Sequence, residues 1–240
     1  MSGSVLRLER VRCAFGAVEV FRELSLEVAR GEFVAVVGPS GCGKTTLLNL
    51  CSGFVRPTAG RVERRGQART VYQQDGLFPW LTVAQNIRLG LRHVRGEEER
   101  GRRLAEMLGL IRLEGFAGHY PHQLSGGMRQ RVELARALAG DTDVLLMDEP
   151  FSSLDYLTRL RLRGELARML GELPRTVVLV THDIEEAAQL ADRVVVLSDR
   201  PATIVRQLGM TLPRPRDPLH PEVVGAEQLI LAELGLGQTG

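Results

Sequence analysis

The sequence predicts an α/β fold with a mostly parallel core sheet, an antiparallel β edge and a helical subdomain. Short apolar runs of strand length, at 33–37, 144–147 and 176–181, alternate with segments of helical spacing. Such alternation is typical of a parallel sheet. Between about residues 81 and 140 the pattern is helical with few strand runs. We therefore expect this segment to be a helical insertion into the α/β core.

The predicted elements form one domain with three parts. Residues 1–80 and 141–210 form the α/β core with its β edge, 81–140 the helical subdomain, and 211–240 a C-terminal loop and helix. A turn is expected at 58–60. We expect strands at 5–12, 24–28, 33–37, 70–73, 144–147, 176–181, 193–198 and 202–206, and the last of these is expected at a sheet edge. We expect helices at 43–52, 83–91, 97–110, 128–138, 156–170, 184–190 and 221–234.

Composition and charge limit the classes of protein to which this chain can belong. Its 240 residues are 44% apolar and 25% charged, as in soluble globular domains, and the net charge is +2. The arginines are spread along the chain, so charge gives no argument for a nucleic-acid partner. The sequence shows neither a signal-like N-terminus nor an apolar run of about 18–20 residues. We expect a cytosolic protein that reaches a membrane only through a partner.

A glycine-rich loop follows the strand at 33–37 and opens a helix, the arrangement of a phosphate-binding loop (P-loop). It fits the pattern G-x-x-x-x-G-K-[ST], and a chance glycine turn would lack this context. Glycines let backbone N–H groups surround an anion, and the helix N-terminus adds positive potential. Lys44 is the only lysine of the chain, and a compact ammonium suits such a loop better than a guanidinium. The residues predicted to bind a nucleoside triphosphate are Gly38, Pro39, Ser40, Gly41, Cys42, Gly43, Lys44, Thr45 and Thr46.

Two further strand ends carry polar side chains. Asp148 and Glu149 close the strand at 144–147, and His182 follows the strand at 176–181. A P-loop enzyme needs an acid at such a strand end to hold Mg²⁺, for which Thr45 supplies a hydroxyl, so we assign Asp148 that role. Glu149 is the candidate general base, and His182 the candidate contact to the γ-phosphate and the water. The alternatives are a surface acidic turn and a structural histidine.

A second glycine loop, Leu124-Ser125-Gly126-Gly127-Met128-Arg129-Gln130, opens the predicted helix at 128–138. A serine hydroxyl, free backbone N–H groups and a helix N-terminus together can bind an anion. The bare pattern is equally consistent with a helix N-cap formed by Ser125.

Together these motifs resemble those of ATP-binding cassette (ABC) proteins over almost the whole chain. The loop at 124–130 is similar to the family's signature motif and lies between the P-loop and Asp148, as in that family. The resemblance implies a P-loop NTPase fold with a RecA-like core. It implies that Phe15 stacks on adenine and that Gln73 touches Mg²⁺ and the attacking water. It also implies that Asp155 belongs to the D-loop (152–155) of a dimer and that His182 is the switch histidine.

The resemblance also implies a mechanism that needs a second copy of the chain. Two cassettes pair head to tail, and each ATP lies between the P-loop of one copy and Ser125, Gly126 and Gly127 of the other. The implied cofactors are ATP and Mg²⁺. Closure of the pair drives transmembrane permease subunits at the cytoplasmic face of the inner membrane, and a solute-binding protein takes part indirectly.

The segment at 75–83 indicates a branch of the family. It contains Leu-x-Pro-Trp-Leu-Thr-Val and resembles the ATPases of bacterial nitrate, taurine and alkanesulfonate importers, as do 181–187, 192–201 and 212–217. Trp80 is expected to anchor the core of the helical insertion and, by the resemblance, to lie near the groove that receives the permease. The segment from Gly60 to Gln73 is shorter than the resemblance leads us to expect, so the antiparallel edge is expected to be clipped.

Two other function classes stay open as alternatives to an importer ATPase. A non-transport ABC ATPase acting on nucleic acid or ribosomes typically carries coiled-coil insertions, zinc-binding cysteines or tandem cassettes, which this sequence does not show. A P-loop kinase or GTPase would leave the loop at 124–130 unexplained, and the guanine motif Asn-Lys-x-Asp would need a second lysine. The importer hypothesis accounts for every motif and predicts no nucleic-acid partner.

Overall fold

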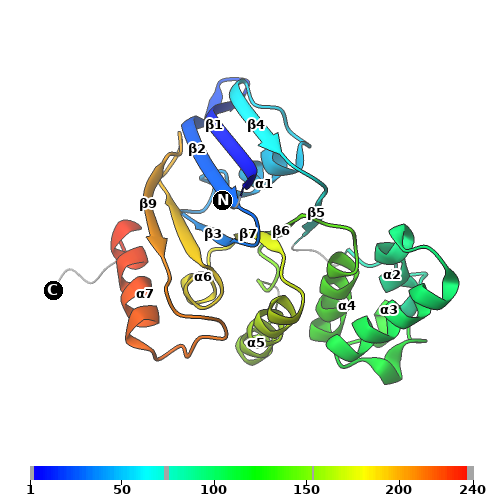
Figure 1. Cartoon of the computed structure of the whole chain (residues 1–240). Helices are drawn as coiled ribbons and strands as arrows, with labels where there is room; N and C mark the ends of the chain where they lie inside the picture. The colour runs from blue at the N-terminus through cyan, green and yellow to red at the C-terminus, as the bar shows by residue number, and fades with distance from the viewer. Residues whose placement is uncertain (1–2, 73–75, 153, 237–240) are drawn as a thin grey trace.

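The structure is a computed structural model that describes residues 3–72, 76–152 and 154–236. Within these ranges the chain forms an antiparallel sheet, a mostly parallel core sheet and seven α-helices. Figure 1 shows the antiparallel sheet at the top, the core sheet in the middle, α5 and α6 below it, and α7 at the left beside β9. Helices α2, α3 and α4 stand together at the right, as a group beside the core.

The antiparallel sheet has the strand order β2-β1-β4 among the described residues. Its strands are β1 (Ser4–Phe15), β2 (Val18–Ala29) and β4 (Ala59–Arg64). The prediction of a turn at 58–60 was wrong, because β4 already begins at Ala59. Gly60 has φ +82°, and a Cβ there would lie 2.3 Å from the carbonyl oxygen of Arg10. The glycine thus allows β1 and β4 to approach closely where their register is irregular, and it does not reverse the chain.

The core sheet has the order β5-β6-β7-β3-β8-β9 within the described residues. All neighbouring strands are parallel except β8 and β9. The predicted edge strand is present, but it lies at 204–209 instead of 202–206. The strands are β3 (Phe33–Val37), β5 (Ala68–Val71), β6 (Val144–Asp148), β7 (Thr176–Val180), β8 (Arg193–Leu197) and β9 (Ile204–Gly209).

Both faces of the core sheet are buried, and successive residues of each strand supply two different cores. Phe33, Ala35 and Val37 pack in the core shared with the helical segments α2 to α6. Val34 and Val36 pack on the other face, against α1 and the antiparallel sheet. Because both faces are covered, the central strands read as continuous apolar runs and not as alternating patterns.

The helices follow the predicted spacing closely. The prediction for the fourth helix was two residues short, because Ser125 caps α4 and the helix begins at Gly126. Among the described residues, no helix combines the length and the apolar character that crossing a membrane requires. The helices are α1 (Lys44–Ser52), α2 (Val83–Gly90), α3 (Glu97–Leu110), α4 (Gly126–Leu138), α5 (Tyr156–Glu172), α6 (Ile184–Leu190) and α7 (Pro221–Glu233).

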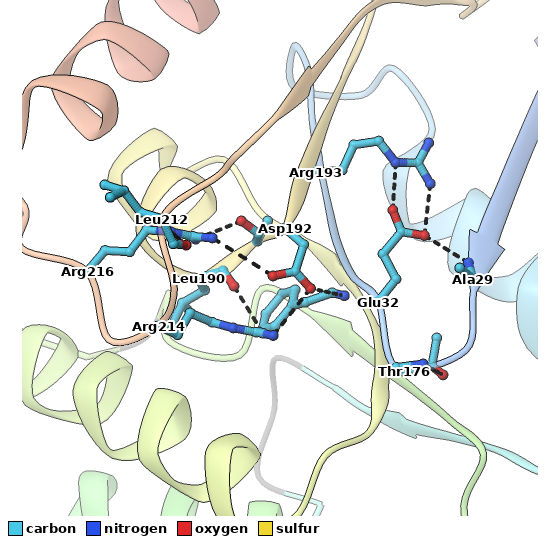
Figure 2. A network of polar contacts seen from close by, with 12 residues as sticks. Ala29, Glu32, Thr176, Leu190, Asp192, Arg193, Leu212, Arg214 and Arg216 are labelled. Carbon is cyan, nitrogen blue, oxygen red and sulfur yellow. Dashed lines mark hydrogen bonds and ion pairs between the residues drawn. The ribbon is translucent and has the colours of Figure 1, made fainter. Parts of the chain in front are cut away.

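Two arginines anchor the segment between β9 and α7 to the core (Figure 2). Arg216, whose side chain is 1% exposed, donates to three carbonyl oxygens at the end of α6, those of Ala188, Gln189 and Ala191. Arg214 donates to Asp192, which also accepts from the N–H of Phe33 at the start of β3 (2.9 Å). A cation at a helix C-terminus satisfies carbonyls that the helix itself leaves unpaired. The C-terminal segment is thereby tied to α6 and β3.

We expect Arg216→Met to lower the free energy of unfolding by about 2–4 kcal/mol, since it leaves buried helix-end carbonyls without donors. Urea denaturation followed by circular dichroism measures this change. Arg206→Met is the matched control, because Arg206 pairs with Glu233 at the surface, and its expected cost is below about 1 kcal/mol. Equal losses in the two variants would contradict the anchoring role of Arg216.

Candidate functional site

Three adjacent strands end at the same edge of the core sheet, and each end carries a predicted site segment. Strands β6, β7 and β3 are neighbours and run parallel. β3 leads into the P-loop, β6 ends at Asp148, and β7 is followed by Thr181 and His182. Ligands of open α/β sheets bind at the carboxyl ends of the strands. The sheet therefore brings the P-loop, the two acidic residues and His182 together.

The P-loop curls around the ammonium of Lys44. The Nζ atom is buried and donates to the carbonyl oxygens of Gly38 (2.9 Å) and Pro39 (3.1 Å). Gly41 and Gly43 have φ values of +78° and +116°, and a Cβ on Gly43 would lie 2.4 Å from Cγ1 of Val20. Only glycine fits such backbone positions without strain. The loop holds a positive charge at its centre and opens directly into α1.

Asp148 and Thr45 form an oxygen-rich pair at the edge of this loop. The side chain of Thr45 hydrogen-bonds the Asp148 carboxyl. The pKa of Asp148 is raised, chiefly because the carboxyl is buried; the Thr45 hydrogen bond and the charge of Lys44 act against this shift. A buried carboxylate is stabilised when a hard cation binds, and hydroxyl and carboxylate oxygens suit Mg²⁺. The donor set fits that ion.

Glu149 and His182 face each other across the ends of β6 and β7. Nδ1 of His182 lies 3.1 Å from Oε2 of Glu149, and both side chains remain partly exposed. Glu149 has φ +46°, an uncommon conformation for a residue with a side chain. Its N–H donates to the carbonyl oxygen of Val180 (2.8 Å), and the Ser152 hydroxyl donates to its carbonyl oxygen (2.9 Å). A strained backbone thus holds the Glu149 carboxylate beside an imidazole, and backbone strain of this kind is typical of functional sites.

The second glycine loop lies elsewhere in the chain. Ser125 is exposed and accepts from the N–H of Met128 (3.3 Å), so it does cap α4. A Cβ on Gly127 would lie 2.9 Å from Cγ2 of Thr158 in α5. Helix α4 packs on α2, α3, α5 and β5, whereas α1 packs on β4, β5, β6 and β7. The buried side chains of α4 and of α1 lie in the cores on opposite faces of the central sheet, so the helix that Ser125 caps and the helix that the P-loop opens cover different faces.

The remaining predicted residues occupy varied positions. Phe15 is exposed at the end of β1, in the hairpin whose other strand, β2, contacts Gly43 through Val20. Asp155 caps α5 by accepting from the N–H of Thr158 (3.0 Å). Gln73 lies outside the described residues, as does Ser153 of the predicted D-loop.

The prediction that Trp80 anchors the core was wrong, because its side chain is 69% exposed. Its ring packs against Phe78 with centroids 5.4 Å apart, and the Arg136 guanidinium lies 5.7 Å from the Phe78 ring centre. These residues line a surface groove of about 470 Å³ between β5 and the helices α2 and α4. Its lining includes Arg69, Phe78, Trp80, Leu89, Arg92 and Arg136.

A buried polar cluster lies directly behind His182, and no residue of it was predicted as part of the site. The hydroxyl of Thr181 donates to Oε2 of Glu186 (2.5 Å), a carboxyl whose other oxygen has no partner within the described part of the chain. Burial raises the pKa of Glu186 to about 7. The N–H of Asp183 donates to the Thr181 hydroxyl (3.0 Å). The only sequence signal was a polar residue opening a helix, with Glu three positions later, which is typical of helix capping alone.

The comparisons of this chain with known proteins all find ATP-binding proteins of ABC transporters. The family described as ABC transporter matches residues 21–152, more than half of the chain. An aliphatic sulfonates import ATP-binding protein of Nocardia farcinica is 43% identical over 95% of this chain and 91% of its own length. A taurine import ATP-binding protein of Pelagibacter ubique is 40% identical over 80% of this chain and 76% of its own length. A solved dimeric ATP-binding cassette bound to ADP and phosphate is 34% identical, with a TM-score of 0.72, over 86% of this chain and 99% of that one.

The raised pKa of Glu186 predicts a pH-dependent stability. The stability contributed by the neutral carboxyl is fully present below about pH 4.5 and is lost as the pH rises through about 7. Between about pH 5 and pH 8 the free energy of unfolding of the wild type should therefore fall by about 3 kcal/mol relative to Glu186→Gln.

Denaturant unfolding of both proteins at the two pH values measures this difference. Glu172→Gln, on the exposed surface of α5, is the control. Its free energy of unfolding should change with pH by the same amount as that of the wild type. If the free energy of unfolding of Glu186→Gln also changes with pH by the same amount as that of the wild type, this carboxyl does not titrate in that range.

Proposed function

Since the chain belongs to the ABC transporter family and is an ATPase subunit of an importer, we propose that it powers the uptake of a small anion. The cargo class is an aliphatic sulfonate, taurine or nitrate. The predicted resemblance to this branch and the predicted α/β cassette fold are thus confirmed. The relatives named for import, and the groove at Trp80, favour transport over an action on nucleic acid.

The observation that carries the site assignment is the meeting of three strand ends at one edge of the sheet. We propose that Lys44, the P-loop N–H groups and Thr46 bind the phosphates, while Phe15 stacks on the adenine ring. The residues 1–80 and 141–210 serve as the core, 81–140 as the helical subdomain, and 211–240 as a C-terminal addition. The chain works at the cytoplasmic face of the inner membrane, attached through permease subunits and served by a solute-binding protein.

Mg²⁺ would be held by Thr45 and Asp148, with Gln73 as a further contact. The pair fits this role because a buried carboxyl with a raised pKa stands beside an exposed hydroxyl at the phosphate site. Bound there, the ion neutralises charge on the β- and γ-phosphates. Lys44 supplies the second positive charge from inside the loop.

Glu149 is the proposed general base. Its carboxylate is partly exposed at the edge where the γ-phosphate would lie, and its neighbour His182 orients it at 3.1 Å. Glu149 accepts the proton of the attacking water at Oε, and the imidazole contacts the γ-phosphate. Because phosphoryl transfer depends mainly on positioning and charge, a fixed backbone at Glu149 favours catalysis by holding the carboxylate in place.

A second copy of the chain completes the site. Ser125 is exposed and Gly126 and Gly127 are partly exposed at the N-terminus of α4, a helix that covers the face of the core sheet opposite to α1. A similar solved cassette is dimeric and holds ADP and phosphate. We propose that each ATP lies between the P-loop of one copy and these three residues of the other, with Asp155 at the dimer contact.

Glu149→Gln is expected to bind ATP with near-native affinity but to lower kcat by about 100-fold or more, because the water loses its base. The same variant should accumulate as a dimer in ATP. Phosphate-release assays and size-exclusion chromatography measure the two effects. Adding Ser125→Arg should abolish the ATP-dependent dimer, and Glu172→Gln should behave as wild type. Normal turnover by Glu149→Gln would remove this residue as the base.

The groove at Trp80 is the proposed docking site of the permease. It combines exposed aromatic rings with the guanidiniums of Arg69, Arg92 and Arg136. Large exposed aromatic and arginine side chains are the residues most enriched at protein interfaces.

Trp80→Ala should leave the ATPase activity of the isolated subunit within about twofold of wild type but weaken its binding to the permease by tenfold or more. Co-purification with membranes that contain the permease measures the binding. Phe54→Ala is a matched control, since Phe54 is also exposed but lies after α1, away from the groove. Unchanged membrane binding of Trp80→Ala would exclude this groove as the docking site.

A further inference from the structure

Two arginines of α5 meet the residue that follows His182. The Asp183 carboxylate accepts from Arg159 (3.0 Å) and, by a short contact, from Arg163. Its other oxygen caps α6 by accepting from the N–H of Glu186 (3.0 Å). Both carboxylate oxygens are thus engaged, and the turn that carries His182 is held from α5 and α6 together.

Arg159 also reaches the loop that follows Glu149. A second nitrogen of its guanidinium donates to the carbonyl oxygen of Leu154 (3.1 Å), one residue before the cap of α5. One planar group therefore joins Leu154, just before α5, to Asp183, the residue after His182. Leu154 lies in the segment that follows Glu149, and Asp183 lies in the turn that carries His182.

Arg163 is the buried member of this arginine cluster, and Arg159 is partly exposed. The Arg163 side chain is 2% exposed, and its guanidinium also pairs with Glu185 (3.1 Å). Burial would raise the pKa of Asp183, but the N–H of Glu186 and the charges of Arg163 and Arg159 outweigh it and hold that pKa below its ordinary value. Buried ion pairs contribute little net stability compared with apolar packing, so stability alone accounts poorly for three charges at this place.

We propose that Arg159 and Arg163 are positioning residues for ATP hydrolysis. By holding Asp183 they fix the turn that presents His182, and Arg159 couples this turn to the loop after Glu149. The proposal rests on the roles proposed above for Glu149 and His182. Both arginines act through the geometry of that pair, because their polar contacts within the described residues are to Asp183, Leu154 and Glu185.

Arg159→Met should lower kcat about tenfold and leave KM for ATP within about twofold, since a misplaced catalytic group slows chemistry without weakening phosphate binding. Arg159→Lys keeps the charge but reaches only one of the two acceptors, so it should recover less than half of the lost rate. Asp183→Asn retains an oxygen for the α6 cap and should reproduce the loss. If Arg159→Met folds poorly, Asp183→Asn carries the test.

Arg193→Met is the matched control. The Arg193 side chain is 23% exposed against 22% for Arg159, and it also joins elements distant in sequence, but far from His182, through Glu32. This variant should lower the melting temperature and leave kcat unchanged. Equal kcat values for Arg159→Met and Arg193→Met would overturn the proposal.

A double variant separates this proposal from the catalytic role of His182. If Arg159 acts through His182, adding Arg159→Met to His182→Ala should cost less than about twofold in kcat, and a full tenfold further loss would overturn the proposal. His182→Ala that keeps full activity would instead refute the role proposed for His182. The loss caused by Arg159→Met in the wild-type background is measured independently of that outcome.

Discussion

The register of three parallel strands is the constraint on which the site depends. Asp148 stands opposite Val180, and Val180 stands opposite Val36, so the three strands end within a residue of one another. The N–H of Glu149 extends this ladder by one bond to the carbonyl oxygen of Val180. Because side chains alternate along a strand, a slip by one residue would turn the Asp148 side chain to the opposite face of the sheet. The buried apolar faces of both cores prevent that slip.

The site is arranged around charges that are incompletely balanced within one chain. Asp148 is a buried carboxyl with a raised pKa, and Lys44 is a buried ammonium that rests on two carbonyl oxygens. Both groups gain when an oppositely charged ligand arrives, and neither needs to move far. Preorganised charge of this kind costs stability in the free protein and favours the state with bound phosphates. The well-packed core on both sides of the sheet offsets that cost.

The parts of the site that could be predicted from the sequence are those that consist of short local motifs. The P-loop, the acidic strand end and His182 each occupy a few consecutive residues, and parallel pairing alone brings them together. The contact of Arg159 with Asp183 joins residues 24 positions apart through the packing of two helices, and periodicity contains no such information. The exposure of Trp80 and the start of β4 at Ala59 depend likewise on tertiary contacts that override local preference.

The single lysine has a consequence for chemical work on this protein. Lys44 carries the only side-chain amine of the chain, and it is buried beneath the carbonyl oxygens of its own loop. Acylating reagents that attack amines therefore have one internal target, and its shielding changes with whatever occupies the loop. The mass gained at this one position becomes a direct reading of occupancy, without a label or an engineered reporter.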